Sequence, residues 1–198
     1  MAKRIVITNR YIQESQAVVS SFGSVRASSF LRYIALTLEA SPDASVKIMN
    51  GLLRNRHFVK TSYSGTDIIK LSEERTASYD GLDAFEAYLS VLEEEKATDP
   101  DADVMVRKTK MPTDYVFGTT SGLIYDVIIN NERGPQKVKM LEKTDTKRYK
   151  NQITLFVYTS GTDLAEQKKP ALPGKSRIGV VRRDRTGRAK CMLSAMEG

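Results

Sequence analysis

The sequence predicts an α+β protein whose front half is mainly helical and whose back half is rich in β-strands. In the first hundred residues, apolar side chains recur at spacings of three and four, which is the pattern of amphipathic helices. After residue 104, short runs of β-branched and alternating apolar residues replace that pattern and favour strands. We therefore expect a helical N-terminal half followed by antiparallel hairpins that form a small barrel or sandwich.

The front half predicts helices that flank one β-hairpin. The clearest helix is 24–40, where apolar residues from Ala27 to Leu38 share one face. Ser41 and Pro42 then supply a cap and a first-turn proline for the next helix. In chain order we expect a strand at 3–8, an ambiguous segment at 9–22, helices at 24–40 and about 43–56, strands at 57–62 and 66–72, and a helix at 82–97.

Proline and aspartate residues at 99–103 predict an acidic, exposed linker between the two halves. It separates a mainly helical part, 1–98, with a hairpin near 57–72, from a β-rich basic part, 104–198. In the second part we expect strands at 104–108, 123–129, 137–143, 152–159, 178–183 and 189–193. The last two strands should form a hairpin across the turn 184–187.

Composition and missing motifs exclude several function classes. One cysteine and one histidine leave no disulfide framework and no histidine-rich or Cys/His metal site. There is no phosphate-binding loop, dinucleotide fingerprint or nucleophile elbow. No apolar run approaches a membrane span, and the N-terminus lacks the apolar stretch of a signal peptide. We therefore predict no catalytic residue, cofactor, metal or membrane, and a location in the cytoplasm or within a virus-like particle.

The charge is segregated along the chain, which has a net charge of +7. Residues 1–72 carry 10 basic and 4 acidic side chains, whereas 73–103 carry 2 basic and 11 acidic ones. Residues 104–198 carry 19 basic and 9 acidic side chains. Basic surfaces of this size bind nucleic acid, an acidic membrane face or an acidic protein. An acidic segment between two basic ones also suits head-to-tail assembly of copies.

Two features of the sequence favour nucleic acid. The order of helix, Ser-Pro-Asp turn, helix and hairpin over residues 24–74 resembles the winged helix-turn-helix of bacterial transcription regulators. That resemblance implies a second helix in the major groove and a hairpin that touches the backbone. Arg54 and Arg56 end this helix and are the candidate contacts.

The second feature is a pair of basic clusters in the back half. One surrounds the last hairpin turn, and the other is expected at the turn before strand 152–159, where Tyr149 could stack on a base. The clusters consist of Arg182, Arg183, Arg185, Arg188 and Lys190, and of Lys147, Arg148 and Lys150. We expect the second cluster to lie beside the first, so that both hairpin tips grip phosphates.

These features predict a non-enzymatic protein that binds DNA or RNA and acts as an oligomer. The alternative is a structural subunit of a phage- or plasmid-encoded assembly, in which basic hairpins dock on the acidic segment 73–103 of a neighbour. A weaker alternative is a metal-dependent nuclease that uses Asp80, Asp83 and Glu86, although acidic residues at a helix N-terminus are more often explained by the helix dipole.

Overall fold

The structure is a computed structural model that describes residues 7–72, 76–144, 150–159, 171–172 and 174–196. The chain divides into two compact units, residues 1–85 and 86–198. The division lies inside the long helix α4 (Tyr79–Thr98), whereas the sequence places it at 99–103. The expected α+β class is confirmed.

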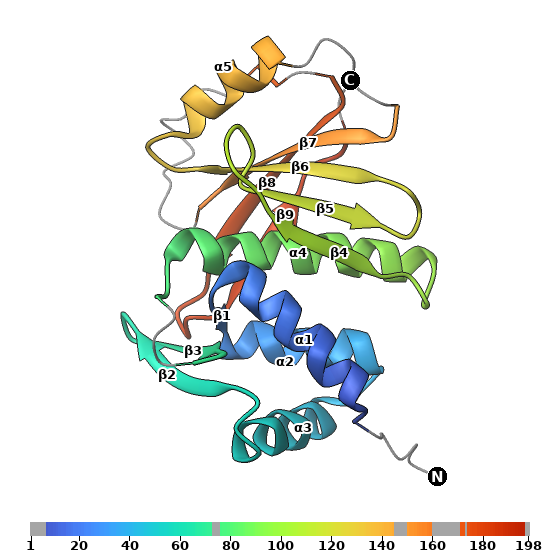
Figure 1. The fold of residues 1–198 in the computed structure, drawn as a ribbon, viewed down its shortest axis with the longest axis vertical. Coiled ribbons are helices and arrows are strands. Elements are labelled where there is room, and N and C mark those ends of the chain that lie inside the picture. The colour runs from blue at the N-terminus through green and yellow to red at the C-terminus, as the bar shows by residue number, and fades with distance from the viewer. Residues whose placement is uncertain (1–6, 73–75, 145–149, 160–170, 173, 197–198) are drawn as a thin grey trace. The chain divides into compact units, whose positions relative to one another are not determined.

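Unit 1 consists of helices and a small antiparallel sheet with strand order β1-β3-β2 (Figure 1). Helix α3 begins where the sequence predicts, because Ser41 caps it by accepting a hydrogen bond from Ala44 N at 3.3 Å and Pro42 occupies the first turn. The elements of unit 1 are α1 (Asn9–Phe22), β1 (Val25–Arg26), α2 (Ala27–Leu38), α3 (Pro42–Arg54), β2 (Val59–Tyr63), β3 (Thr66–Lys70) and the start of α4.

The structure differs from two expectations for the front half. The ambiguous segment 9–22 is helix α1, which is capped by the Thr8 side chain accepting from Tyr11 N at 3.1 Å. The helix expected at 24–40 begins only at Ala27, because Val25 and Arg26 pair with β3 instead. The strand expected at 3–8 falls mostly on residues outside the described part of the chain.

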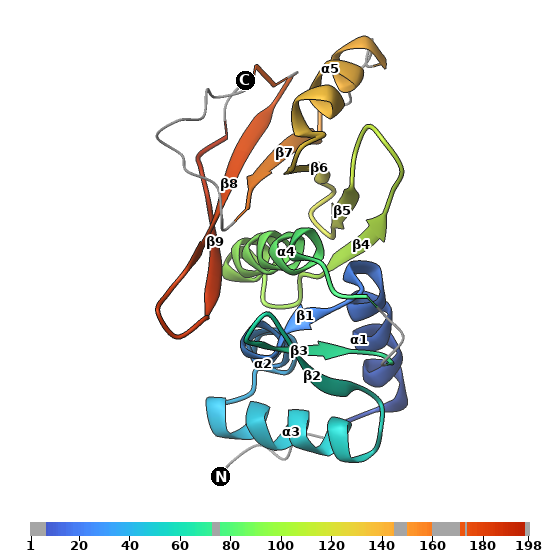
Figure 2. The ribbon, with the colours of Figure 1, turned by 90° about the vertical axis from the view of Figure 1, so that its left-hand side faces the viewer.

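Among its described residues, unit 2 contains the rest of α4, one further helix and a six-stranded sheet with order β4-β5-β6-β7-β8-β9. The sheet curls over α4 (Figure 2). The Tyr88 hydroxyl donates to Val104 O at 3.0 Å, and Ser90 Oγ donates to Cys191 O at 2.7 Å, so α4 is tied to both edge strands. The elements are β4 (Val104–Lys108), β5 (Tyr115–Thr119), β6 (Ile124–Asn130), α5 (Gly134–Thr144), β7 (Gln152–Tyr158), β8 (Ser176–Arg183) and β9 (Ala189–Leu193).

The sheet is mixed, and the expectation of antiparallel hairpins throughout is wrong. Strands β6, β7 and β8 run parallel to one another, while the other neighbours are antiparallel. The strand expected at 137–143 is helix α5, which is the crossover that parallel β6 and β7 require. Val138 and Leu141 on α5 pack with Ile128, Phe156 and Tyr158 of the sheet. Strand β5 is an element that the sequence did not predict.

The acidic stretch 99–103 joins α4 to β4 within unit 2. It forms a turn in which Ala102 N donates to Asp99 O at 2.9 Å, and Lys96 Nζ donates to Pro100 O at 2.8 Å. Ala102 is buried, whereas the three aspartates are exposed. Its role as an acidic linker between a mainly helical part and a β-rich part stays a prediction.

Candidate nucleic-acid interface

The β8–β9 hairpin has a tightly defined tip. Gly187 N donates to Asp184 O at 3.1 Å, and Asp184 N donates to Arg188 O at 2.9 Å. Gly187 has φ +79°, a backbone conformation that is unfavourable for residues with a side chain. In three-residue hairpin loops, a residue in this conformation typically follows a type I turn. Asp and Gly at the two ends of 184–187 are the residues such a turn favours, so this turn was predictable from the sequence.

Asp184 is the only acidic residue between 182 and 190, and its carboxylate is committed to the turn. The oxygen Oδ1 accepts hydrogen bonds from Thr186 Oγ1 at 2.7 Å, from Thr186 N at 2.8 Å and from Arg188 N at 3.0 Å. These bonds, led by the one from the Thr186 side chain, hold the pKa of Asp184 below its ordinary value. The acid therefore stiffens the tip while the surrounding cations face solvent.

All five basic residues predicted for this hairpin are exposed: Arg182, Arg183, Arg185, Arg188 and Lys190. The register places Arg182 opposite Lys190, and Arg183 opposite the buried Ala189. Lys190 Nζ lies 3.6 Å from Glu93 Oε2, but two thirds of the lysine side chain remains exposed. The structure thus brings this predicted cluster together on one rigid hairpin.

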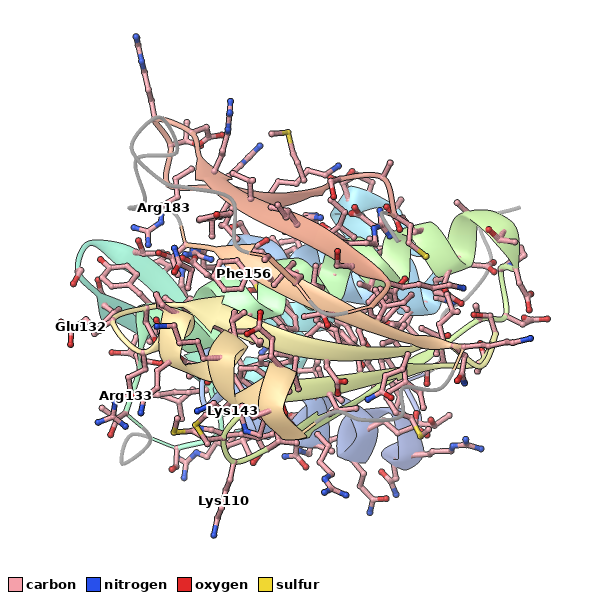
Figure 3. All side chains as sticks on the ribbon, turned by 90° about the horizontal axis from the view of Figure 1, so that it is seen from above. Lys110, Glu132, Arg133, Lys143, Phe156 and Arg183 are labelled. Carbon is pink, nitrogen blue, oxygen red and sulfur yellow. The ribbon has the colours of Figure 1, made fainter. Side chains whose placement is uncertain are left out.

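The hairpin extends from one particular edge of the sheet, at which the parallel strands β6, β7 and β8 end. Asn130 pairs with Tyr158, and Tyr158 with Val180, so β6 and β7 end level with Val180, and β8 continues from there to Arg183. Strand β4 ends elsewhere: Lys108 pairs with Tyr115 and Tyr115 with Val127, and this row continues through Leu155 to Arg177, near the start of β8. Figure 3, a view from above, labels Arg183 of this hairpin together with Arg133 and Lys110, which belong to other parts of unit 2.

An ion pair between a buried lysine and a partly exposed aspartate lies near the end of β6. Lys137 Nζ on α5 donates to both oxygens of Asp114, at 2.7 and 2.8 Å, and its side chain is only 4% exposed. Asp114 Oδ2 also accepts from Ile129 N at 2.8 Å. The pair therefore clamps the β4–β5 loop to the end of β6 and the start of α5. Lys137 is used structurally and adds little charge to the surface.

The other predicted cluster lies elsewhere. Lys150 is exposed just before β7, at the edge where the parallel strands begin, so it is not beside the final hairpin as expected. Seven residues of β8 separate Ser176 at that edge from Arg183, which is roughly 23 Å at 3.3 Å per residue. The reason is that β7 and β8 run parallel, so the start of β7 and the end of β8 lie at opposite edges of the sheet. Lys147, Arg148 and Tyr149 lie outside the described residues.

Arg54 and Arg56 belong to unit 1 and are both exposed. Arg54 is the last residue of α3, and Arg56 follows the helix with φ +56°. Two exposed polar residues that the sequence reading did not select, Lys47 and Asn50, precede Arg54 at helical spacing. The sequence could have indicated both residues, because they lie on the face of α3 opposite to its buried residues Ser45, Met49 and Leu52.

The acidic residues considered for metal binding have other roles in the structure. Asp83 is fully buried and forms an ion pair with the equally buried Arg26, which also donates to Leu82 O at 3.0 Å. Asp80 lies in the first turn of α4, as the helix dipole favours, and Glu86 is buried. In the described part of the chain, no three His, Cys, Asp or Glu side chains gather as a metal site.

The acidic run Glu93–Glu95, the docking site in the assembly alternative, already has partners within the chain. Glu94 accepts from both terminal nitrogens of Arg177, at 2.5 and 2.9 Å. That pairing raises the pKa of Arg177 above its ordinary value. Together with the contact between Glu93 and Lys190, it reduces the negative charge that a neighbouring copy would meet.

Two further findings bear on the classification of the chain. Among the helices that the structure describes, none combines the length and the apolar character that crossing a membrane requires. Comparisons with protein-family models, with curated proteins and with solved structures gave no match for this chain.

Proposed function

We propose that this protein binds nucleic acid without cleaving it, and that the β8–β9 hairpin supplies the main phosphate contacts. The observation that carries the proposal is the concentration of five exposed cations on a hairpin whose only acid is engaged by its own turn. Positive charges held on a stiff scaffold neutralise phosphates and release counterions. Arg54 and Arg56 at the end of α3 form a secondary patch in unit 1.

Simultaneous replacement of Arg183, Arg185 and Arg188 by alanine should weaken binding to every sequence alike. The plot of log binding constant against log salt concentration should become shallower by roughly three units, because each lost phosphate contact removes about 0.9. Fluorescence anisotropy with labelled DNA and RNA across a salt series measures this slope. The fold should persist, because exposed substitutions cost about 0.5 kcal/mol or less each.

The matched control replaces three other exposed cations, Lys139, Lys143 and Lys175, with alanine. It has the same net charge as the hairpin variant, so a general field effect would lower both slopes equally. Light scattering on the same preparations tests the assembly alternative. An unchanged slope together with loss of oligomers in the hairpin variant would overturn the nucleic-acid proposal and favour docking between copies.

Incubation of the protein with labelled nucleic acid and Mg²⁺ or Mn²⁺ should yield no cleavage products. The expectation rests on the ion pair that occupies Asp83, because a metal-dependent nuclease needs carboxylates free to hold the ion. Product formation is followed on denaturing gels over hours at several protein concentrations. Cleavage that disappears in an Asp80→Asn or an Asp83→Asn variant would refute this prediction.

A further inference from the structure

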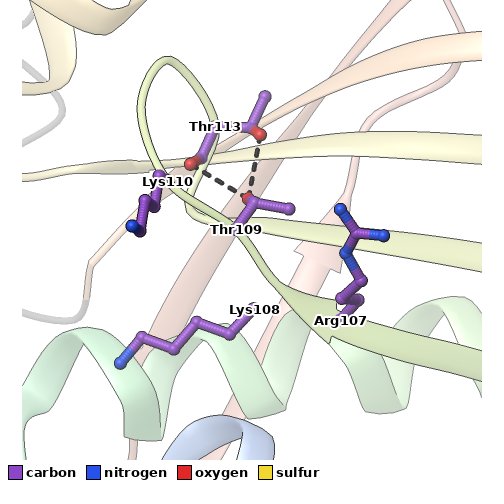
Figure 4. A pocket seen from close by; sticks show the side chains of 5 residues that line it. All are labelled: Arg107, Lys108, Thr109, Lys110 and Thr113. Atoms are coloured by element: carbon purple, nitrogen blue, oxygen red, sulfur yellow. Dashed lines mark hydrogen bonds between the residues drawn. The ribbon is translucent and has the colours of Figure 1, made fainter.

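The β4–β5 loop lies beside an open pocket of about 740 Å³ (Figure 4). A volume of roughly 300–1,000 Å³ is usual for sites that bind small molecules. The lining consists of three cations and two hydroxyl side chains, without an acidic or an aromatic residue: Arg107, Lys108, Thr109, Lys110 and Thr113. An anion is therefore the class of ligand that this lining fits.

The three cations of the pocket are not neutralised by the part of the chain that the structure describes. All three side chains are exposed, and no carboxylate of the described residues forms an ion pair with Arg107, Lys108 or Lys110. The acid at the end of the loop, Asp114, is already engaged, because Lys137 Nζ donates to both of its oxygens. The loop therefore presents positive charge that an incoming anion can neutralise.

Hydrogen bonds fix the loop that carries these cations. Thr109 N donates to Asp114 O at 2.9 Å, and Asp114 N donates to Val127 O at 2.8 Å. Thr109 Oγ1 donates to Thr113 O at 3.0 Å, so Thr113 Oγ1 is the donor in the hydroxyl pair that these two threonines form at 2.9 Å. Both hydroxyl protons are thus used within the loop, and the cations make the contacts with a ligand.

We propose that this pocket binds an oligophosphate, which is a small anion with two or more linked phosphate groups, either as an inorganic chain or as part of a nucleotide. Figure 4 shows Lys108 and Lys110 extending to one side of Thr109, and Arg107 extending to the other. Cations on both sides suit a chain of phosphates better than a single phosphate group. The planar guanidinium of Arg107 can also bind two oxygens of the chain at once. The inference goes beyond the proposed function, because its ligand is a small molecule.

The pocket is a separate site from the tip of the β8–β9 hairpin. The row of paired residues that starts at Lys108 of β4 reaches β8 at Arg177, six residues before Arg183. Six residues of strand span roughly 20 Å, so one short phosphate chain cannot contact both sites.

The concentration of charge favours a free oligophosphate over a nucleic-acid backbone. Each strand of a duplex carries one charge per about 3.4 Å of its axis. An oligophosphate carries several charges on adjacent groups, and the pocket has its three cations within residues 107–110. The lining has no aromatic ring on which a base could stack and no amide or carboxylate that could read a base edge. The phosphate chain is therefore the part of the ligand that the pocket recognises.

Isothermal titration calorimetry with inorganic tripolyphosphate tests the site. The full chain is used in the background of the β8–β9 triple variant, so that the hairpin competes less for the anion, and divalent cations are omitted because they bind the chain themselves. Lys108→Ala/Lys110→Ala should weaken binding about tenfold, since it removes two charge contacts. The control Lys139→Ala/Lys175→Ala removes two exposed cations that do not line the pocket, and it should weaken binding by less than about threefold.

The length of the phosphate chain provides a second test. Affinity should rise from inorganic phosphate to pyrophosphate to tripolyphosphate, and Arg107→Ala should weaken tripolyphosphate binding more than phosphate binding, because only the chain reaches both sides of the pocket. ATP that binds as tightly as tripolyphosphate supports an inorganic chain as sufficient ligand, whereas tighter binding of ATP supports a nucleotide. Equal affinities for phosphate and tripolyphosphate would overturn the proposal.

Circular dichroism and thermal melting confirm that each variant folds. An equal loss of tripolyphosphate affinity in the pocket and control variants would show a general field effect and refute the site. If Lys108→Ala/Lys110→Ala lowers the salt slope for DNA by about two units and leaves tripolyphosphate binding unchanged, the pocket contacts nucleic acid and the oligophosphate assignment fails. The proposed function is judged separately, by the DNA and RNA slopes of the β8–β9 triple variant, so the two failures are distinguishable.

Discussion

Replacing Asp83 with alanine should lower the free energy of unfolding of unit 1 by about 3–5 kcal/mol. Asp83 and Arg26 form an ion pair whose side chains are 0% and 1% exposed. The substitution leaves the Arg26 guanidinium in the core without its carboxylate, where water cannot solvate it. Because small domains have a total stability of about 5–15 kcal/mol, a large fraction of the variant should be unfolded at moderate urea concentrations.

Urea denaturation followed by far-ultraviolet circular dichroism measures the loss, since the chain has no tryptophan. Two controls isolate the cause. Asp67→Ala breaks the exposed pair between Lys60 and Asp67 and should cost within about 1 kcal/mol. The double variant Arg26→Met/Asp83→Leu removes both buried charges and should be more stable than Asp83→Ala. If the double variant is as unstable as the single one, lost packing and not an abandoned charge is responsible.

The sequence predicts those elements of unit 1 whose signals are local. Helix α3 has its cap and first-turn proline in the sequence, and the following hairpin has a glycine in its turn. Helix α1 was ambiguous because its buried face includes Ser15 together with Tyr11 and Val19. A polar residue at a core position breaks the apolar spacing, and only the tertiary fold shows that the face is buried.

One error in unit 2 is the assignment of residues 137–143 to a strand, and another is the expectation that β7 and β8 run antiparallel. Met140 and Leu141 disturb the strand alternation, and Val138 and Leu141 are spaced by three, as helix α5 requires. With a strand at 137–143, the crossover between β6 and β7 becomes two antiparallel hairpins. Lys150 is misplaced because β7 and β8 run parallel, which puts the start of β7 and the end of β8 at opposite edges.

In the candidate site, too, features set by adjacent residues were predictable from the sequence, whereas features set by strand pairing were not. The β8–β9 hairpin and its five cations follow from turn chemistry and adjacent residues, so the sequence predicts them together. The pocket at Arg107, Lys108 and Lys110 was not predicted. Its lining residues are brought together by the pairing of β4 with β5, and β5 was missed.

Helix α4 should tolerate no side chain at Gly81, and Gly81→Ala should destabilise unit 1 by about 1–3 kcal/mol or more. A Cβ atom placed there would lie 2.3 Å from the carbonyl oxygen of Phe22, at the end of α1. That oxygen belongs to the backbone and cannot rotate away, so the two helices have to separate. Their separation would also loosen the contact between the Phe22 and Phe85 rings, whose centroids are 5.2 Å apart.

Gly51→Ala is the matched control, because it makes the same substitution within another helix of the same unit. A Cβ atom at Gly51 meets nothing within 4 Å, so the change adds helix propensity without a clash. It should therefore stabilise unit 1 by up to about 1 kcal/mol, while Gly81→Ala acts in the opposite direction. The urea midpoints of the two variants measure both effects. If both midpoints rise, α1 and α4 pack less closely in solution than the short distance from a Gly81 Cβ to Phe22 O implies.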